Sequence, residues 1–137
     1  MTVQQQPLRE PDAQGAAVRR FRDPAYRPMA DKLADVRGEI DRIDDAIVRL
    51  VAERAMYVKD AARFRRDAFQ VSAPARQAQV FARVRELATG HNPAFNGGFE
   101  GLPDVVESAY RALVAGFIEC EQHYFGATEA ISEEQQQ

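Results

Sequence analysis

Cysteine is nearly absent from this sequence, and its scarcity narrows the available chemistry. The 137 residues contain one cysteine, Cys120. A single thiol excludes an intrachain disulfide and any metal cluster built from cysteines, and it is typical of a reducing compartment. We interpret Cys120 as a buried helix residue and not as a nucleophile. His91 and His123 lie far apart without partners at metal-ligand spacing, so we predict no metal site.

Long apolar runs and a surplus of positive charge are also missing. No segment approaches the roughly 20 apolar residues needed to span a bilayer. The N-terminus, with its run of glutamines at positions 4–6, lacks the apolar core of a secretory signal. The net charge is −3, so nucleic acid is not a favoured partner. We therefore predict a cytoplasmic protein that binds neither membrane nor nucleic acid.

The length predicts one domain with flexible ends. Residues 1–28 are rich in proline, carry a basic run (Arg19, Arg20, Arg22) and show little periodicity. We expect them to form a flexible N-terminal arm, which is either solvated or docked on an acidic surface. A helical domain then covers residues 29–126, and a polar tail covers residues 127–137.

The stretch 31–66 has the strongest periodicity in the chain. Its apolar residues recur at steps of three and four and form one stripe, which comprises Val36, Ile40, Ile43, Ile47, Leu50, Tyr57 and Ala61. Nothing interrupts the pattern before about Asp67. A helix of this length, roughly 50 Å at about 1.5 Å per residue, is longer than a small domain is wide. Most of its stripe therefore needs another chain to cover it.

Two shorter helices follow. Pro74 opens the second, which ends at Gly90, and Pro103 opens the third, which runs to about Phe125. The glycine-rich loop 91–101 between them is interpreted as a surface insertion. Because no strand-like alternation is present, we predict an all-α fold with three helices per chain, one of them very long.

Three charged residues interrupt the predicted apolar faces. Arg54 stands where the long stripe calls for an apolar residue, and Arg65 follows after about three whole turns, so we expect both on one helical face. Glu121 lies one turn after Phe117, and burial would favour its protonated form. The simpler alternatives are arginine stems lying along apolar surface and an edge glutamate paired with an arginine. Together, the three suit a small anionic ligand rich in oxygen.

Several spaced motifs carry a family resemblance that covers about Leu33 to Phe125. They are Arg37 followed by I-D-x-I-D (Ile40 to Asp44), Arg54, Y-V-K at Tyr57 to Lys59, the basic run Arg63 to Arg65, A-P-x-R at Ala73 to Arg76, and Tyr110, Arg111, Leu113, Val114, Phe117, Ile118 and Glu121 in the third helix. In these motifs the sequence resembles the all-helical (AroQ-type) chorismate mutases and the related isochorismate-pyruvate lyases.

The resemblance implies an intertwined homodimer with two active sites. Arg37 and Arg54 are 17 residues apart, roughly 25 Å along one helix. One small ligand therefore meets both only if Arg37 comes from the partner chain.

The resemblance also assigns roles to individual residues. Arg37 of the partner chain and Arg54 would bind the two carboxylates of the substrate. Arg65, in place of the usual lysine, would contact a carboxylate and the ether oxygen. Glu121, where many relatives have glutamine, would face the same oxygen. Arg76 and Gln77 would lie at the lip of the site, near the ring hydroxyl.

The implied activity is that of a chorismate mutase, an isomerase of the shikimate pathway that supplies prephenate for aromatic amino acids. It requires no cofactor, metal or covalent intermediate. Three alternatives stay open: a lyase that converts isochorismate to salicylate and pyruvate, a mutase of an amino-substituted chorismate, and a helical dimer without catalytic activity.

Overall fold

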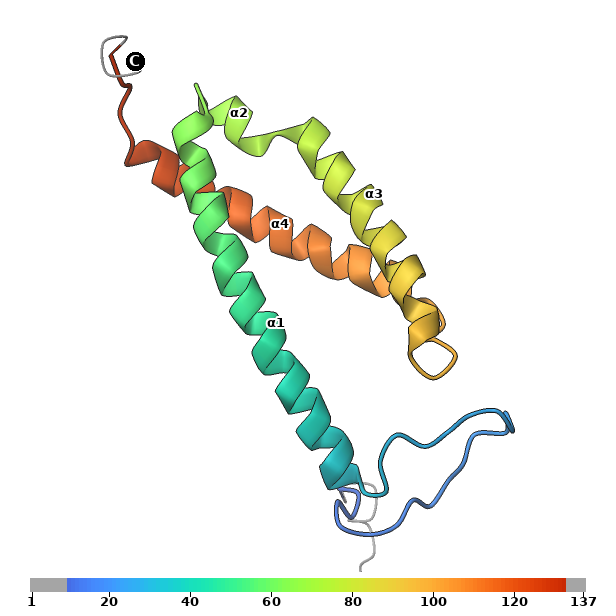
Figure 1. The fold of residues 1–137 in the computed structure, drawn as a ribbon. Helices are drawn as coiled ribbons and strands as arrows, with labels where there is room; N and C mark the ends of the chain where they lie inside the picture. The colour runs from blue at the N-terminus through green and yellow to red at the C-terminus, as the bar shows by residue number, and fades with distance from the viewer. Residues whose placement is uncertain (1–9, 133–137) are drawn as a thin grey trace, which may run out of the picture. The chain divides into compact units, whose positions relative to one another are not determined.

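The computed structural model describes residues 10–132, and all regular secondary structure in that range is helical. Figure 1 shows the elements, which in chain order are α1 (Leu33–Ala61), the 3₁₀ turn Ala62–Phe64, α2 (Ala68–Ser72), α3 (Pro74–His91), the 3₁₀ turn Asn92–Ala94 and α4 (Leu102–Gly126). The predicted all-α class with three main helices is confirmed, and the five-residue α2 is an addition. None of these described helices is long and apolar enough to cross a membrane.

The chain divides into two units, one ending at Arg49 and one beginning at Leu50. In the first unit, residues 10–32 fold back on the start of α1. The Ala34 amide donates to the Ala13 carbonyl at 2.9 Å, and an isolated antiparallel bridge joins Ala16 to Lys32. The predicted arm and tail extend into residues 1–9 and 133–137, which lie outside the described range.

The apolar stripe of α1 is open to solvent within the first unit. Ile40 and Ile47 are each 51% exposed, and Ile43 is 44% exposed. No residue of α1 is buried in the single chain. A row of isoleucines at helical spacing normally faces a core, but no described residue of the first unit covers this stripe.

The end of α1 differs from the prediction. The long helix does not continue to Asp67 but ends at Ala61, and the backbone of Arg65 is extended (φ −99°, ψ 141°). Asp67 is the reason, because its carboxylate accepts from the Gln70 amide at 2.9 Å and caps α2. A capping residue needs extended backbone angles, which end one helix and begin the next. The spacing of Arg54 and Arg65 predicted that both lie on one helical face. This prediction was wrong, because Arg65 lies beyond the end of the helix.

The second unit is held together by the packing of α3 against α4. Val84 and Ala88 of α3 are buried, as are Val114 and Glu121 of α4. Cys120 is exposed, so the prediction that it is buried was wrong. The buried face of α4 passes through positions 114 and 121, and position 120 is turned about 100° away from 121.

Arginines add charged contacts along the seam between α3 and α4. Arg85 of α3 donates to Asp104 at 2.8 Å and to Glu107 at 3.2 Å, and Arg111 donates to Glu107 at 2.7 Å. Arg111 also lies over the ring of Phe81, at 4.4 Å from its centroid. Hydrogen bonds from two arginines hold the pKa of Glu107 below its usual range. The bond from Arg111 has the larger effect and the bond from Arg85 the smaller one.

The glycine-rich loop 91–101 is ordered by one side chain. The side-chain Nδ2 of Asn92 donates to the Phe99 carbonyl at 3.0 Å, and the side-chain Oδ1 of Asn92 accepts from the backbone N–H of Phe99 at 2.7 Å. Gly97, Gly98 and Gly101 have φ values of 85°, 99° and 78°. This left-handed backbone favours glycine and closes the loop over a short distance.

Replacing Glu107 with glutamine should lower the melting temperature at pH 7. A carboxylate with a lowered pKa in the folded state contributes stability above its unfolded pKa of about 4.3 and loses it as the pH falls through the folded value. The difference in melting temperature between wild type and Glu107→Gln should therefore shrink below about pH 4, as measured in thermal melts monitored by circular dichroism. Glu86→Gln is the control, because Glu86 meets only Arg83 at 3.9 Å on the exposed face of α3. A difference that persists at pH 3 would contradict this prediction.

Candidate active site

A pocket of about 290 Å³ lies within the second unit. Four segments line it: the C-terminal part of α1, the connection through α2, the start of α3 and the middle of α4. Its charged and polar lining residues are Arg54, Tyr57, Arg65, Ser72, Arg76, Gln77 and Glu121. The volume is at the lower end of the range of small-molecule sites. Five of the six predicted site residues thus line one pocket.

Arg54 is oriented by two aromatic rings of α4. Its guanidinium carbon lies 5.3 Å from the centre of the Phe117 ring and 5.8 Å from that of Tyr110. A planar guanidinium stacks well on such faces, and the contact fixes the side chain without using its hydrogen-bond donors. Within residues 10–132, no carboxylate comes within ion-pair distance of Arg54. Its donors are therefore available to a carboxylate that enters the pocket.

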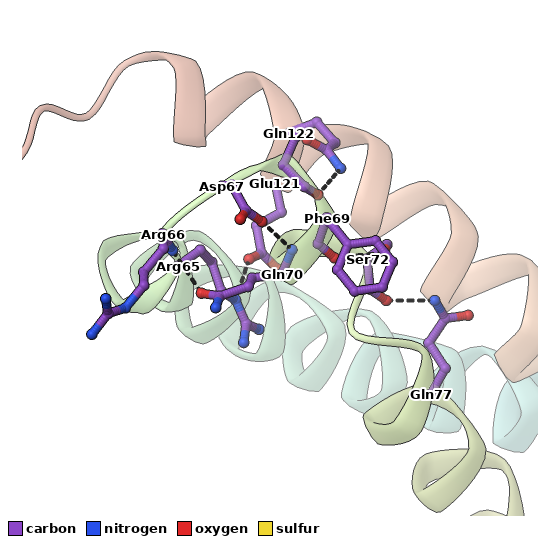
Figure 2. Close-up of polar contacts among 10 residues, drawn as sticks. Arg65, Arg66, Asp67, Phe69, Gln70, Ser72, Gln77, Glu121 and Gln122 are labelled. Carbon is purple, nitrogen blue, oxygen red and sulfur yellow. Dashed lines mark hydrogen bonds and ion pairs between the residues drawn. The ribbon is translucent and has the colours of Figure 1, made fainter.

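Arg65 and Glu121 form an ion pair at the base of the pocket (Figure 2). The Arg65 Nε donates to Glu121 Oε2 at 3.0 Å. Glu121 is only 4% exposed, whereas the Arg65 side chain is 27% exposed. Of the simpler alternatives from the sequence, the pairing of this glutamate with an arginine is confirmed, but Glu121 is buried and does not lie at an edge. The guanidinium has five N–H groups, so the bond to Glu121 leaves four for a ligand.

The wall between α2 and α3 contains a strained residue. Ala73 lies in the left-handed region (φ 41°, ψ 63°) directly before Pro74, a position at which helical backbone is sterically disfavoured. Gln77 supports this turn, because its Nε2 donates to the Ser72 carbonyl at 2.5 Å and its backbone amide donates to the Ala73 carbonyl at 3.0 Å. One N–H of its side-chain amide is therefore committed to the protein, and the second N–H and the amide oxygen are left for a ligand.

Side chains of α4 and of the connection itself hold α2 in place (Figure 2). Gln122 of α4 donates to the Ala68 carbonyl at 3.0 Å, and Gln70 accepts from the Arg66 amide at 2.7 Å. Val71 is 1% exposed and forms part of the pocket wall. The connection that carries Arg65 is thus anchored at both ends.

The remaining predicted residues occupy different places. Arg76 lines the pocket but is exposed, as expected for a residue at its lip. Arg37 is exposed and belongs to the first unit, and it is not among the lining residues. The pocket of one chain therefore contains three of the four predicted arginines together with one carboxylate.

Sequence reasoning missed the contribution of α2 and of the turn that follows it. Val71, Ser72 and Ala73 all line the pocket, but the sequence analysis assigned no helix and no site residue between about Asp67 and Pro74. The spacing of Asp67 and Gln70 was the available signal, because an acidic N-cap followed three residues later by glutamine is a helix-start pattern. The family resemblance placed Arg65 and Glu121 at the same substrate oxygen, but nothing in the sequence identified Arg65 as the arginine that pairs with Glu121, 56 residues away.

Comparison with known proteins leads to the same family as the motifs. The profile of chorismate mutase type II matches residues 36–122, more than half of the chain. A chorismate mutase from Methanocaldococcus jannaschii is 34% identical over 80 residues, which cover 58% of this chain and 81% of that protein. The matched segment contains Arg37 and every predicted pocket residue. This chain belongs to the chorismate mutase type II family.

Proposed function

We propose that this protein is a chorismate mutase that rearranges chorismate to prephenate. Family membership and the chorismate mutase of M. jannaschii support this activity. One observation carries the proposal: Arg54, Arg65 and Arg76 line the same small pocket beside the buried Glu121. Three cations against one carboxylate suit a ligand with two carboxylates, since one arginine is already paired and the other two have no ion-pair partner among residues 10–132.

The proposed active unit is an intertwined homodimer. The exposed isoleucine stripe of α1 supports it, because a second copy of the helix would bury these side chains. The spacing of Arg37 and Arg54 supports it independently, since one small ligand cannot reach both along a single helix. In this dimer, Arg37 of the second copy would add a fourth guanidinium to the pocket.

Orientation is the first proposed contribution to catalysis. The enolpyruvyl arm of chorismate must fold over the ring before the new carbon–carbon bond can form. Arg54 and Arg37 of the second copy would each bind one carboxylate and hold the compact conformer. Fixing a reactive geometry in this way can contribute several kcal/mol. The stacking of Arg54 on Phe117 supports the proposal, because a guanidinium fixed before binding loses little freedom on binding.

Stabilisation of negative charge is the second proposed contribution. The carbon–oxygen bond breaks early in this rearrangement, so charge builds up on the ether oxygen. Arg65 and a protonated Glu121 would donate to that oxygen. Loss of one such donor costs about 3 kcal/mol in well-studied enzymes. The apolar wall of Val71, Val114 and Ile118 would exclude water from this end of the pocket.

The substrate is tested by incubating the purified protein separately with chorismate and with isochorismate. We expect chorismate to be converted to prephenate. The reaction is monitored by the loss of chorismate absorbance, and the product is identified by chromatography. Formation of salicylate and pyruvate from isochorismate, with no turnover of chorismate, would show that the protein is a lyase and not a mutase. Absence of turnover with either substrate would overturn both activities.

The rate should rise between neutral and mildly acidic pH because Glu121 donates only when it carries a proton. Glu121→Gln supplies a neutral donor of the same shape and should flatten the profile of kcat/KM against pH. Glu119→Gln is the control, since Glu119 is exposed on the same helix. A wild-type rate that stays flat or falls on acidification would contradict the role of Glu121.

Mixing two inactive variants tests whether Arg37 of one chain completes the active site of the other chain. Arg37→Ala and Arg54→Ala should each lower kcat/KM by at least about a hundredfold, in line with the loss of a carboxylate clamp. Unfolding and refolding the two variants together should restore about one quarter of the wild-type activity, because half of the dimers are hybrid and each hybrid has one intact site. Failure of the mixture to exceed either variant alone would show that the two arginines do not meet across chains.

A further inference from the structure

Arg65 lines two cavities of the second unit. Besides the active-site pocket, it borders a cavity of about 770 Å³ formed by residues 62–66 after α1, the end of α4 and the segment after α4. Arg63, Arg66, Phe64, Phe125 and Ile131 are among the other residues of its lining. None of these five lines the active-site pocket. Arg65 is thus the one charged residue that lines both cavities.

The second cavity has an excess of positive charge. Three arginines line it, against the single carboxylate of Glu129. Arg63 is paired with Asp60 at 3.0 Å, but within residues 10–132 no carboxylate lies within ion-pair distance of Arg66. Arg65 has four N–H groups that do not point to Glu121. Such a cluster attracts an anion able to accept several hydrogen bonds.

Apolar side chains accompany the arginines. Phe64 is 73% exposed and Ile131 is 52% exposed, and both line the cavity together with Phe125. A simple inorganic anion would leave these surfaces in water. An anion attached to an apolar body would cover them and gain their burial.

We propose that this second cavity binds a small organic anion with an apolar body, and that its occupancy withdraws Arg65 from the active-site pocket. The binding site stands on the lining alone, whereas the effect on catalysis rests on the proposed function. The anion would compete with Glu121 and with the substrate for one guanidinium. Because the same group cannot serve both cavities fully, the two ligands must weaken each other by the same factor.

Binding is tested by calorimetry on the full chain, with benzoate as the probe and inorganic phosphate as the anion without an apolar body. Arg66→Gln should weaken benzoate binding by roughly threefold to fivefold, the loss expected for one partly exposed ionic contact. The fold should survive, because Arg66 supports α2 through its backbone amide alone. Arg83→Gln is the matched control, since Arg83 is an exposed arginine outside both cavities.

A second variant separates the two cavities. Arg54→Gln removes a charge from the active-site pocket only, so benzoate should still bind with its wild-type affinity. Phosphate should bind more weakly than benzoate. Loss of benzoate binding in Arg54→Gln, or unchanged binding in Arg66→Gln, would overturn the proposal, because either result places the anion elsewhere.

The coupling is measured by kinetics with chorismate. Saturating benzoate should lower kcat/KM at least fivefold in wild type. In Arg66→Gln, whose basal kcat/KM should equal that of wild type, the same concentration should have a smaller effect. Equal inhibition of both proteins would overturn the withdrawal of Arg65. If the protein turns over no chorismate but benzoate binding still depends on Arg66, the proposed function fails and the anion site remains.

Discussion

The ion pair between Arg65 and Glu121 is the contact on which the pocket depends. It joins the connection after α1 to the middle of α4, and its carboxylate is almost fully buried. A buried carboxylate without a partner is costly, so this pair holds the connection against α4. The same guanidinium has four N–H groups that this bond does not use. Arg65 also lines two cavities. One interaction thus supports the local fold and provides the charge that the proposed chemistry requires.

Three other residues around the pocket are held in place by the protein itself. Arg54 is stacked on Phe117, Gln77 is bonded to the Ser72 carbonyl, and Ala73 is kept in a left-handed conformation. Residues in strained conformations persist only where their surroundings determine them. Side chains fixed in this way lose little entropy on binding, which favours catalysis by orientation. The pocket is therefore suited to a rearrangement that needs a folded conformer and no covalent intermediate with the protein.

The exposed stripe of α1 and the position of Arg37 have the same physical explanation in the proposed dimer. Isoleucines at helical spacing are stable in water only when another surface covers them. A chain of 137 residues has only a small core, and these isoleucines of the long helix are exposed in the single chain. Covering the stripe with a second copy would bury it and would also bring Arg37 to the pocket of that copy.

The sequence by itself determined the helical class, the approximate bounds of α3 and α4, and the residues Arg54, Arg65, Arg76, Gln77 and Glu121 that line the pocket. Periodicity and spaced motifs report such local features directly. Only the tertiary structure decided that α1 ends at Ala61, that Cys120 is exposed, and that Glu121 meets Arg65. The reason is that capping competes with helix extension, and the pairing of distant charges depends on how helices pack. Neither can be read from the pattern of a single helix.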